Sequence, residues 1–285
     1  MMGDRSRPHD EPAPKLQAPD GTTDTHMHVF APGFPLHGAP PPTSATTLDD
    51  YARVRRRLGI DRAVVVQPNA YRTDNACLED ALMRMGGMAR GVAVVTPEVP
   101  EVELERLDGL GVRGARIMNM GGAPVGLDRL HAVAGRIAPF GWHTIVQFDG
   151  CDIEEHAERL AGVPGTYVID HIGKFLTPVD VDSAAFACLL NLVDRGNCFV
   201  KLSACYETSR CGPPDYEDVG RLAEALAAHA PERMLWASNW PHVGVTRGPC
   251  PDDARMLDLL LDWAPQESVR RRILVDNPAG LYGFG

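Results

Sequence analysis

The chain has 285 residues, a length that suits either two ordinary domains or one large α/β barrel. Hydrophobic residues make up 44% of it and charged residues 23%, so the chain can bury a large core without disulfides. The formal net charge of −10 argues against nucleic acid or an anionic membrane surface as the main partner. A small anionic substrate stays compatible with that charge, because a binding site is local and net charge is global.

The N-terminal region is polar and rich in proline, so we predict a disordered tail over 1–20 and a single folded domain over 21–285. The tail lacks the apolar core of a secretory signal, and no apolar run reaches the roughly 18 residues that a membrane span needs. The seven cysteines form no CxxC pair and indicate reduced thiols. We therefore expect a cytoplasmic protein without membrane contact, whose oligomeric state the sequence leaves open.

After the tail, eight short β-branched runs alternate with helical stretches. The expected strands cover 22–29, 63–67, 92–95, 114–118, 144–148, 167–171, 199–203 and 234–238. The expected helices cover 48–58, 75–86, 100–109, 127–138, 152–161, 182–194, 216–229, 252–263 and 266–274. Runs such as AVVVQ are apolar on both faces, which is typical of a parallel sheet covered by helices. Eight such units, with no GxGxxG motif after a strand, favour a single-domain (β/α)8 TIM barrel over a doubly wound sheet.

Histidines mark the C-terminal ends of two expected strands, which is where barrel active sites lie. His26 and His28 end the first strand, and the period of 2 puts them on the same face. His171 ends the sixth strand. These three side chains suit acid–base chemistry or metal binding, with packed structural histidines as the alternative. Lys201, on the seventh strand, is expected to be an internal partner, and the irregular segment 31–47 is placed to cover the site.

Polar residues at the other strand ends are candidates for binding an anionic, hydroxylated ligand. Arg116 should point inward from the fourth strand, where a buried cation needs a substrate anion or a neighbouring carboxylate. Lys174, just past the sixth strand, is either a second anion contact or a surface lysine. Asn239 and His242, after the eighth strand, stand where hydrolytic barrels often carry a catalytic group, with a tight turn as the alternative. Further hydroxyl contacts are expected from Asn69, Tyr71, Gln147 and Tyr206. Ordinary turn, amide or packing roles are the alternative for these four.

Several motifs resemble one branch of the amidohydrolase superfamily, the 2-pyrone-4,6-dicarboxylate lactonase-like group. They are DTHMHVF, LGIDRAVVVQ, GVRGARI, VIDHIGK, ASNWPH and LVDNPAGLY, and they span nearly all of the chain after the tail. The segments APGFPLHG, VQFDG, YETSR and PDDAR are more similar to the sugar-acid lactone isomerases of that group. This resemblance implies a TIM barrel that converts D-galactaro-1,5-lactone to the 1,4-lactone.

The chain departs from the lactonases at the end of the eighth strand. They carry an aspartate where this chain has Asn239, and an amide cannot take a proton at neutral pH. The isomerase resemblance implies asparagine there, and it makes His26 a less secure site residue than His28. The binuclear superfamily sites need ligands where this chain has Arg116, Gln147 and Asn239. Because the relatives it resembles work without metal, no metal and no other cofactor are expected.

The implied reaction is an intramolecular acyl transfer, in which the 4-hydroxyl attacks the lactone carbonyl and the 5-oxygen leaves. The expected catalytic residues are His28, His171 and Asn239. Either His171 or His28 shuttles the proton, while Asn239 orients a hydroxyl or donates to the oxyanion. The expected substrate contacts are His26, Asn69, Tyr71, Arg116, Gln147, Lys174, Tyr206 and His242. A lactone hydrolase, a non-catalytic sugar-acid binding protein and a metal-dependent amidohydrolase remain the alternatives.

Overall fold

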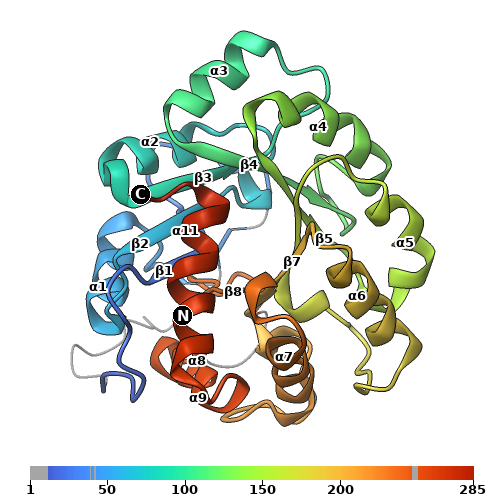
Figure 1. The fold of residues 1–285 in the computed structure, drawn as a ribbon. Coiled ribbons are helices and arrows are strands. Elements are labelled where there is room, and N and C mark those ends of the chain that lie inside the picture. Colours follow the sequence, from blue (N-terminus) through green and yellow to red (C-terminus); the bar gives the residue numbers. More distant parts are fainter. Residues whose placement is uncertain (1–11, 39, 42, 246–249) are drawn as a thin grey trace.

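Eight parallel strands form a nearly closed barrel with helices between them, as predicted (Figure 1). The computed structural model describes residues 12–38, 40–41, 43–245 and 250–285. In chain order the strands are β1 Thr23–Met27, β2 Arg62–Val66, β3 Ala89–Ala93, β4 Val112–Met118, β5 His143–Gln147, β6 Tyr167–Ile169, β7 Cys198–Leu202 and β8 Met234–Trp236. Each strand pairs in parallel with the next, from β1 to β8. The Thr25 hydroxyl joins the first strand to the last by donating to the Trp236 carbonyl at 2.8 Å.

Helices cover the outside of the barrel. They are α1 Leu48–Leu58, α2 Ala76–Met85, α3 Glu101–Gly109, α4 Leu130–Ile137, α5 Ile153–Ala161, α6 Ala184–Asp194, α7 Glu217–His229, α8 Asp253–Asp258, α9 Leu260–Trp263, α10 Glu267–Arg271 and α11 Asn277–Tyr282. The first begins at a capping box, in which the Thr47 and Asp50 side chains bond each other's backbone N–H groups. It ends at Gly59, whose φ of 70° suits glycine.

The third strand begins three residues earlier than expected, at Ala89 rather than Val92. It ends early because the Asn75 side chain takes both backbone groups of Val94. The Asn75 amide donates to the Val94 carbonyl and its oxygen accepts the Val94 N–H, each at 3.0 Å. The expected helix over 252–263 is divided into α8 and α9. These shifts change element boundaries and leave the eight-unit topology intact.

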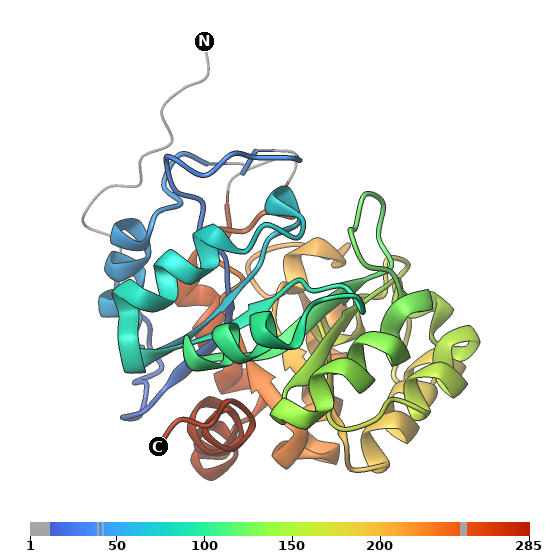
Figure 2. The ribbon, with the colours of Figure 1, turned by 90° about the horizontal axis from the view of Figure 1, so that it is seen from above.

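The barrel interior is apolar at one end and polar at the other. Its apolar layer is closed by the C-terminal residues, with Tyr282 fully buried against the inward side chains of the strands. Those side chains are Val64, Val66, Val92, Ile145, Val168 and Leu235. Figure 2 shows α11 lying across this end of the barrel. The polar side chains therefore gather at the opposite end, where the strands finish.

The first described residues lie against the barrel, although the sequence predicted a tail over 1–20. Leu16 is 3% exposed, and its N–H donates to the Asp258 side chain at 2.9 Å. Arg57 donates to the Pro12 carbonyl. Residues 1–11 lie outside the described part of the chain.

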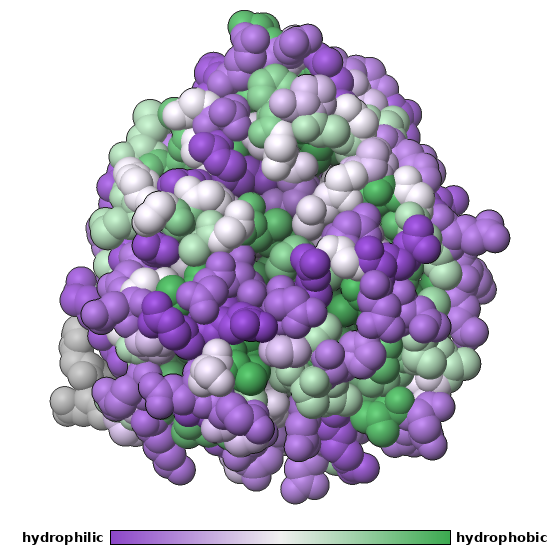
Figure 3. All heavy atoms as spheres, in the orientation of Figure 1, coloured by the Kyte–Doolittle hydropathy of each residue, from purple (hydrophilic) through white to green (hydrophobic). Residues whose placement is uncertain are grey.

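The molecular surface is mixed in polarity. The face in Figure 3 is mostly hydrophilic and interrupted by small apolar areas. No described helix is long and apolar enough to cross a membrane.

Candidate active site

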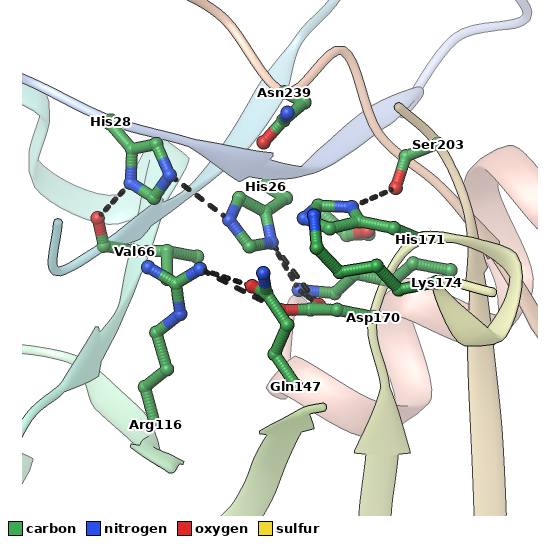
Figure 4. Close-up of polar contacts among 12 residues, drawn as sticks. His26, His28, Val66, Arg116, Gln147, Asp170, His171, Lys174, Ser203 and Asn239 are labelled. Atoms are coloured by element: carbon green, nitrogen blue, oxygen red, sulfur yellow. Dashed lines mark hydrogen bonds and ion pairs between the residues drawn. The ribbon is translucent and has the colours of Figure 1, made fainter. Parts of the chain in front are cut away.

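Buried polar side chains meet at the C-terminal end of the barrel strands, as Figure 4 shows. They are His26, His28, Arg116, Gln147, Asp170, His171, Lys174, Lys201, Ser203 and Asn239, none more than 6% exposed. Burying so many polar groups is unfavourable unless they pair with one another. The way in which these groups pair therefore decides which atoms remain available to a ligand.

Asp170 is the negative centre of this cluster. One of its oxygens lies 3.4 Å from Lys201 Nζ and 3.3 Å from His26 Nδ1, and the other lies 3.9 Å from an Arg116 nitrogen. Burial alone would raise the pKa of Asp170, but Lys201, His171 and Arg116 outweigh it and lower that pKa. Burial lowers the pKa of Lys201 to about 8, so its amine is mostly charged at neutral pH. Two cations thus face one carboxylate, and this part of the site is net positive.

Arg116 is also held by neutral acceptors. It donates to the Gln147 side-chain oxygen at 2.7 Å and to the Gln67 carbonyl at 3.1 Å. Its Nε is buried without a hydrogen-bond partner. The predicted inward orientation of Arg116 is confirmed. The sequence left two partners for Arg116, a substrate anion and a neighbouring carboxylate, and the structure is compatible with both. Asp170 is such a carboxylate, and the Nε–H stays available for a substrate anion.

His26 and His28 lie in a hydrogen-bonded row that fixes their tautomers. Lys201 Nζ lies 3.0 Å from His26 Nδ1, the two Nε2 atoms are 3.3 Å apart, and His28 Nδ1 lies 2.7 Å from the Val66 carbonyl. An ammonium only donates and a carbonyl only accepts, so His26 carries its proton on Nε2 and His28 on Nδ1. Burial lowers the pKa of His26 well below its usual range and that of His28 to about 3. Both rings are neutral, and all four of their nitrogens are engaged.

His171 differs from the other two histidines because one ring nitrogen is available. Its Nδ1 bonds the Ser203 hydroxyl at 2.9 Å, whereas Nε2 has no hydrogen-bond partner among the described residues. Its ring lies 5.1 Å from the His26 ring. Burial lowers the pKa of His171 well below its usual range, so the ring is neutral. Of the two histidines expected to shuttle a proton, His171 is the one with a ring nitrogen not bonded to protein. That nitrogen can accept a proton when Nδ1 carries the ring hydrogen and donates to Ser203.

The Asn239 amide is held by two residues that follow β7. Its nitrogen donates to the Tyr206 hydroxyl at 2.8 Å and to Glu207 Oε1 at 3.1 Å. Both amide hydrogens are therefore used, while Oδ1 is buried without a partner. The other Glu207 oxygen pairs with Lys174. This arrangement serves the predicted orienting role of Asn239, because Oδ1 can accept a hydroxyl, and it leaves no amide hydrogen for an oxyanion.

His242 lies behind Tyr206 and not at the surface of the site. It is 2% exposed, with Nε2 2.9 Å from Asp253 and Nδ1 3.0 Å from the Tyr206 hydroxyl. Both ring nitrogens are bonded to protein, so neither is free to make the expected contact with a substrate hydroxyl. His242 instead supports Tyr206, which is partly exposed.

Asn69 and Tyr71 lie beside the cluster, in the turn after β2. The Tyr71 hydroxyl accepts the Ala31 N–H at 3.3 Å, and its ring lies against Phe30. The His37 N–H bonds the carbonyl of Ala70, so the part of segment 31–47 near His37 lies against this turn. No side-chain hydrogen bond joins either residue to the cluster within the described ranges. Tyr71 therefore holds the segment after β1, and the covering role of that segment stays a prediction.

Backbone strain is concentrated at this end of the barrel. A positive φ is unfavourable for residues with a side chain, and clusters of such residues are common at functional sites. Seven of the eight non-glycine residues with positive φ in the described chain follow β6, β7 or β8, with φ from 50° to 64°. They are His171, Ile172, Lys174, Ala204, Tyr216, Asn239 and His242. Strain here favours a functional reading of these three loops.

Comparison with known proteins places the chain in a family. The family described as Amidohydrolase matches residues 23–284. The chain belongs to the amidohydrolase family. It is 40% identical to D-galactarolactone isomerase of Agrobacterium fabrum, over 95% of this chain and 94% of that protein. It is 36% identical to 2-pyrone-4,6-dicarboxylate hydrolase of Comamonas testosteroni, over 94% and 92%. An apo crystal structure from Agrobacterium tumefaciens has a TM-score of 0.93 and 39% identity, covering 98% of this chain and 99% of that one.

A metal site in this amidohydrolase would need donor atoms that no other cation already occupies. His26, Asp170 and His171 offer donor atoms within 4.8 Å of one another. The Lys201 amine, however, already contacts the His26 nitrogen and the Asp170 oxygen that a cation would take. Arg116 adds a second positive charge. The residues present do not fit a divalent cation, because the charge it would supply is already supplied by Lys201.

Three carboxylates of this amidohydrolase were not singled out from its sequence. Asp170 directly precedes His171, Glu207 directly follows Tyr206, and Asp253 begins α8. Their positions beside predicted site residues were the available signal. Acidic residues are frequent in loops, so only the three-dimensional contacts show that these three organise the site. The expected internal role of Lys201 is confirmed by its contacts with His26 and Asp170.

Proposed function

We propose that this amidohydrolase is a sugar-acid lactone isomerase that converts D-galactaro-1,5-lactone to D-galactaro-1,4-lactone without a metal. The observation that carries the proposal is the residue set at the strand ends. One neutral histidine has a free nitrogen, the strand-8 position holds an amide, and both carboxylates of the cluster are paired with cations. The 40% identity to a D-galactarolactone isomerase over 95% of the chain supports it independently.

His171 handles the proton in this proposal. Its Nε2 takes the proton of the 4-hydroxyl as that oxygen bonds to the lactone carbonyl carbon. When the bond from this carbon to the 5-oxygen breaks, the same nitrogen returns the proton to the 5-oxygen. No proton is gained or lost, so one histidine is sufficient for the cycle. Asn239 Oδ1 accepts a hydrogen bond from a substrate hydroxyl and holds it in place for attack.

Charge selects the substrate in this proposal. Arg116 and Lys201 face a single carboxylate, Asp170, and this surplus attracts the carboxylate of the sugar acid. Lys174, which Glu207 already neutralises, lies at the same mouth and offers further N–H donors. The same positive surplus stabilises the oxyanion that forms during acyl transfer. The substrate is thus a small anionic lactone.

Isomerisation is favoured over hydrolysis because no unpaired carboxylate is present among the described residues of the cluster to activate water. Asp170 and Glu207 are held by cations, and the Asn239 amide cannot accept a proton. The attacking hydroxyl belongs to the substrate, so its effective concentration is far above that of a bimolecular nucleophile. Hydrolysis of a lactone remains the second candidate function, because relatives named as lactone hydrolases are 34–36% identical to this chain.

A product-resolved NMR time course tests the proposal. Freshly prepared D-galactaro-1,5-lactone should give the 1,4-lactone faster with protein than in an enzyme-free control, because such lactones rearrange and hydrolyse by themselves. Open-chain galactarate as the first product would show a hydrolase instead. Binding without turnover would show a sugar-acid binding protein. Unchanged activity after dialysis against a chelator is expected, and loss of activity that added metal restores would contradict metal independence.

A further inference from the structure

We propose that Glu207 is the residue that restricts this site to isomerisation. Its carboxylate holds the Asn239 amide with Oδ1 toward the substrate, and it excludes a second ionised carboxylate at position 239. The inference rests on the proposed function and adds a specificity-determining residue to it. Glu207 acts through Asn239 and Lys174, so it is a positioning residue.

Glu207 bridges two groups of the site. It ends the turn Cys205–Glu207 after β7, beside the loop that carries Asn239 after β8. Oε1 accepts the Asn239 amide at 3.1 Å, and Oε2 pairs with Lys174. The Glu207 and Lys174 side chains are only 9% and 7% exposed, so solvent screens this bridge weakly.

The loop after β8 confines the carboxylate from a third side. At Gly244, an added Cβ would collide with Oε1 and the carboxyl carbon of Glu207. The backbone of this loop therefore lies directly against the carboxylate, and a side chain at position 244 would have to displace it. Lys174, Asn239 and Gly244 leave the carboxylate little freedom to move.

This confinement determines which end of the amide faces the substrate. An ionised carboxylate only accepts hydrogen bonds, so the Asn239 nitrogen must face Glu207. The amide oxygen then points away from Glu207, and it is buried without a partner. Figure 4 shows Asn239 at the edge of the histidine group, where that oxygen can meet a hydroxyl. Glu207 thereby makes Asn239 a hydrogen-bond acceptor of fixed direction.

The contact between Glu207 and residue 239 also prevents a carboxylate at position 239 from acting as a general base. An aspartate there would bring two carboxylates to about 3 Å, and the repulsion between like charges at that distance strongly raises the pKa of one of the pair and favours its protonated form. A protonated acid cannot activate water. Hydrolysis therefore requires two changes together, a carboxylate at 239 and the removal of the Glu207 charge.

Four proteins test this inference: the parent, Asn239→Asp, Glu207→Gln and the double variant. The assay follows D-galactaro-1,5-lactone in ¹⁸O-labelled water, because hydrolysis places ¹⁸O in the product carboxylate and isomerisation does not. We expect Glu207→Gln to lower kcat for isomerisation at least tenfold with KM within threefold, since the amide loses its fixed direction. We expect Asn239→Asp to lose isomerisation without gaining hydrolysis. The double variant should incorporate ¹⁸O at least tenfold faster than Asn239→Asp.

Each substitution interconverts a carboxylate and an amide of nearly the same shape, so folded variants are expected, and Tm measurements check this. Glu103→Gln is the matched control, because Glu103 also pairs with a basic side chain, Arg106, but lies on the outer helix α3. It should leave both products unchanged. Glu207→Gln at parental kcat, or Asn239→Asp hydrolysing as fast as the double variant, overturns the inference.

Carboxyl ¹³C NMR of the Asn239→Asp protein separates this inference from the proposed function. One carboxyl of the 207–239 pair should remain protonated at pH 7, and none should in the double variant. A parent that isomerises, combined with two ionised carboxylates in Asn239→Asp, overturns the role of Glu207 alone. A parent that hydrolyses the lactone overturns the proposed function and the specificity claim together.

Discussion

The site consists of two neighbouring groups that differ in whether their histidine nitrogens are all paired. The inner group comes from the strands β1, β4 and β7 and from the residues directly after β1 and β6: His26, His28, Arg116, Asp170 and Lys201. The rim group comes from the loops after β6, β7 and β8: His171, Lys174, Tyr206, Glu207 and Asn239. In the inner group every histidine nitrogen is engaged. In the rim group His171 Nε2 and Asn239 Oδ1 remain available among the described residues.

This difference separates two tasks. Each strand is held by its neighbours in the sheet, so charged groups placed on the strands keep a fixed position at the base of the site. Loops are constrained less by the sheet, and the rim residues instead carry backbone strain and side-chain bridges that hold them. We infer that the inner group sets the charge of the site and the rim group does the chemistry. Substitutions should therefore affect mainly stability in the inner group and mainly turnover at the rim.

The largest effect is expected from Asp170→Asn in the inner group. It would leave Arg116 and Lys201 buried without their shared carboxylate, and removing one partner of a buried ion pair typically costs about 3–5 kcal/mol. Urea denaturation measures the change in the free energy of unfolding. Asp194→Asn, which breaks an exposed contact with His229, is the matched control and should cost less than about 1 kcal/mol. Equal losses in the two variants would contradict the role given to the inner group.

A rim substitution should do the reverse. His171→Gln keeps a polar side chain beside Ser203 but removes the nitrogen that takes the proton, so kcat should fall about 100-fold or more. The free energy of unfolding should change by less than about 1 kcal/mol. Steady-state kinetics and denaturation are compared on the same preparation. If His28→Gln lowers kcat further than His171→Gln, the proton belongs to the inner group and the comparison fails.

The contrast also marks the limit of sequence-based prediction. Period 2 in the strands predicted His26, His28 and Arg116 on the inner face, because strand geometry is local. The direction of the Asn239 amide was not predictable, since it depends on Glu207, 32 residues away in sequence. The start of the folded part was predicted too late for a similar reason, because Leu16 contacts Asp258, 242 residues away. Local pattern determines which side chains face inward, and long-range contacts determine which of their atoms stay free.

The pH dependence of stability should report the buried histidines. Burial lowers the pKa of His28 and His143 to about 3, so each is neutral when folded and takes up a proton on unfolding below pH 6.5. The unfolded state then binds more protons, and stability falls as the pH drops from 6.5 toward 3. His28→Gln removes one such proton. The free energy of unfolding of His28→Gln minus that of the parent should therefore increase by about 1.4 kcal/mol for each pH unit by which the pH falls below 6.5. A constant difference between pH 7 and pH 4 would show that His28 is charged in the folded protein.

The smallest effect is expected from Tyr71→Phe, which tests the outer limit of the rim group. The Tyr71 hydroxyl accepts the Ala31 N–H at 3.3 Å and also interacts with the Cys77 side chain, and the residue is 1% exposed. Phenylalanine keeps the ring against Phe30 and loses these two contacts, so stability should fall by about 1–2 kcal/mol, with KM within twofold. Tyr206→Phe is the matched comparison, because its hydroxyl bonds Asn239 and should lower kcat about tenfold. A tenfold rise in KM for Tyr71→Phe would instead place Tyr71 in contact with the substrate and extend the rim group to the turn after β2.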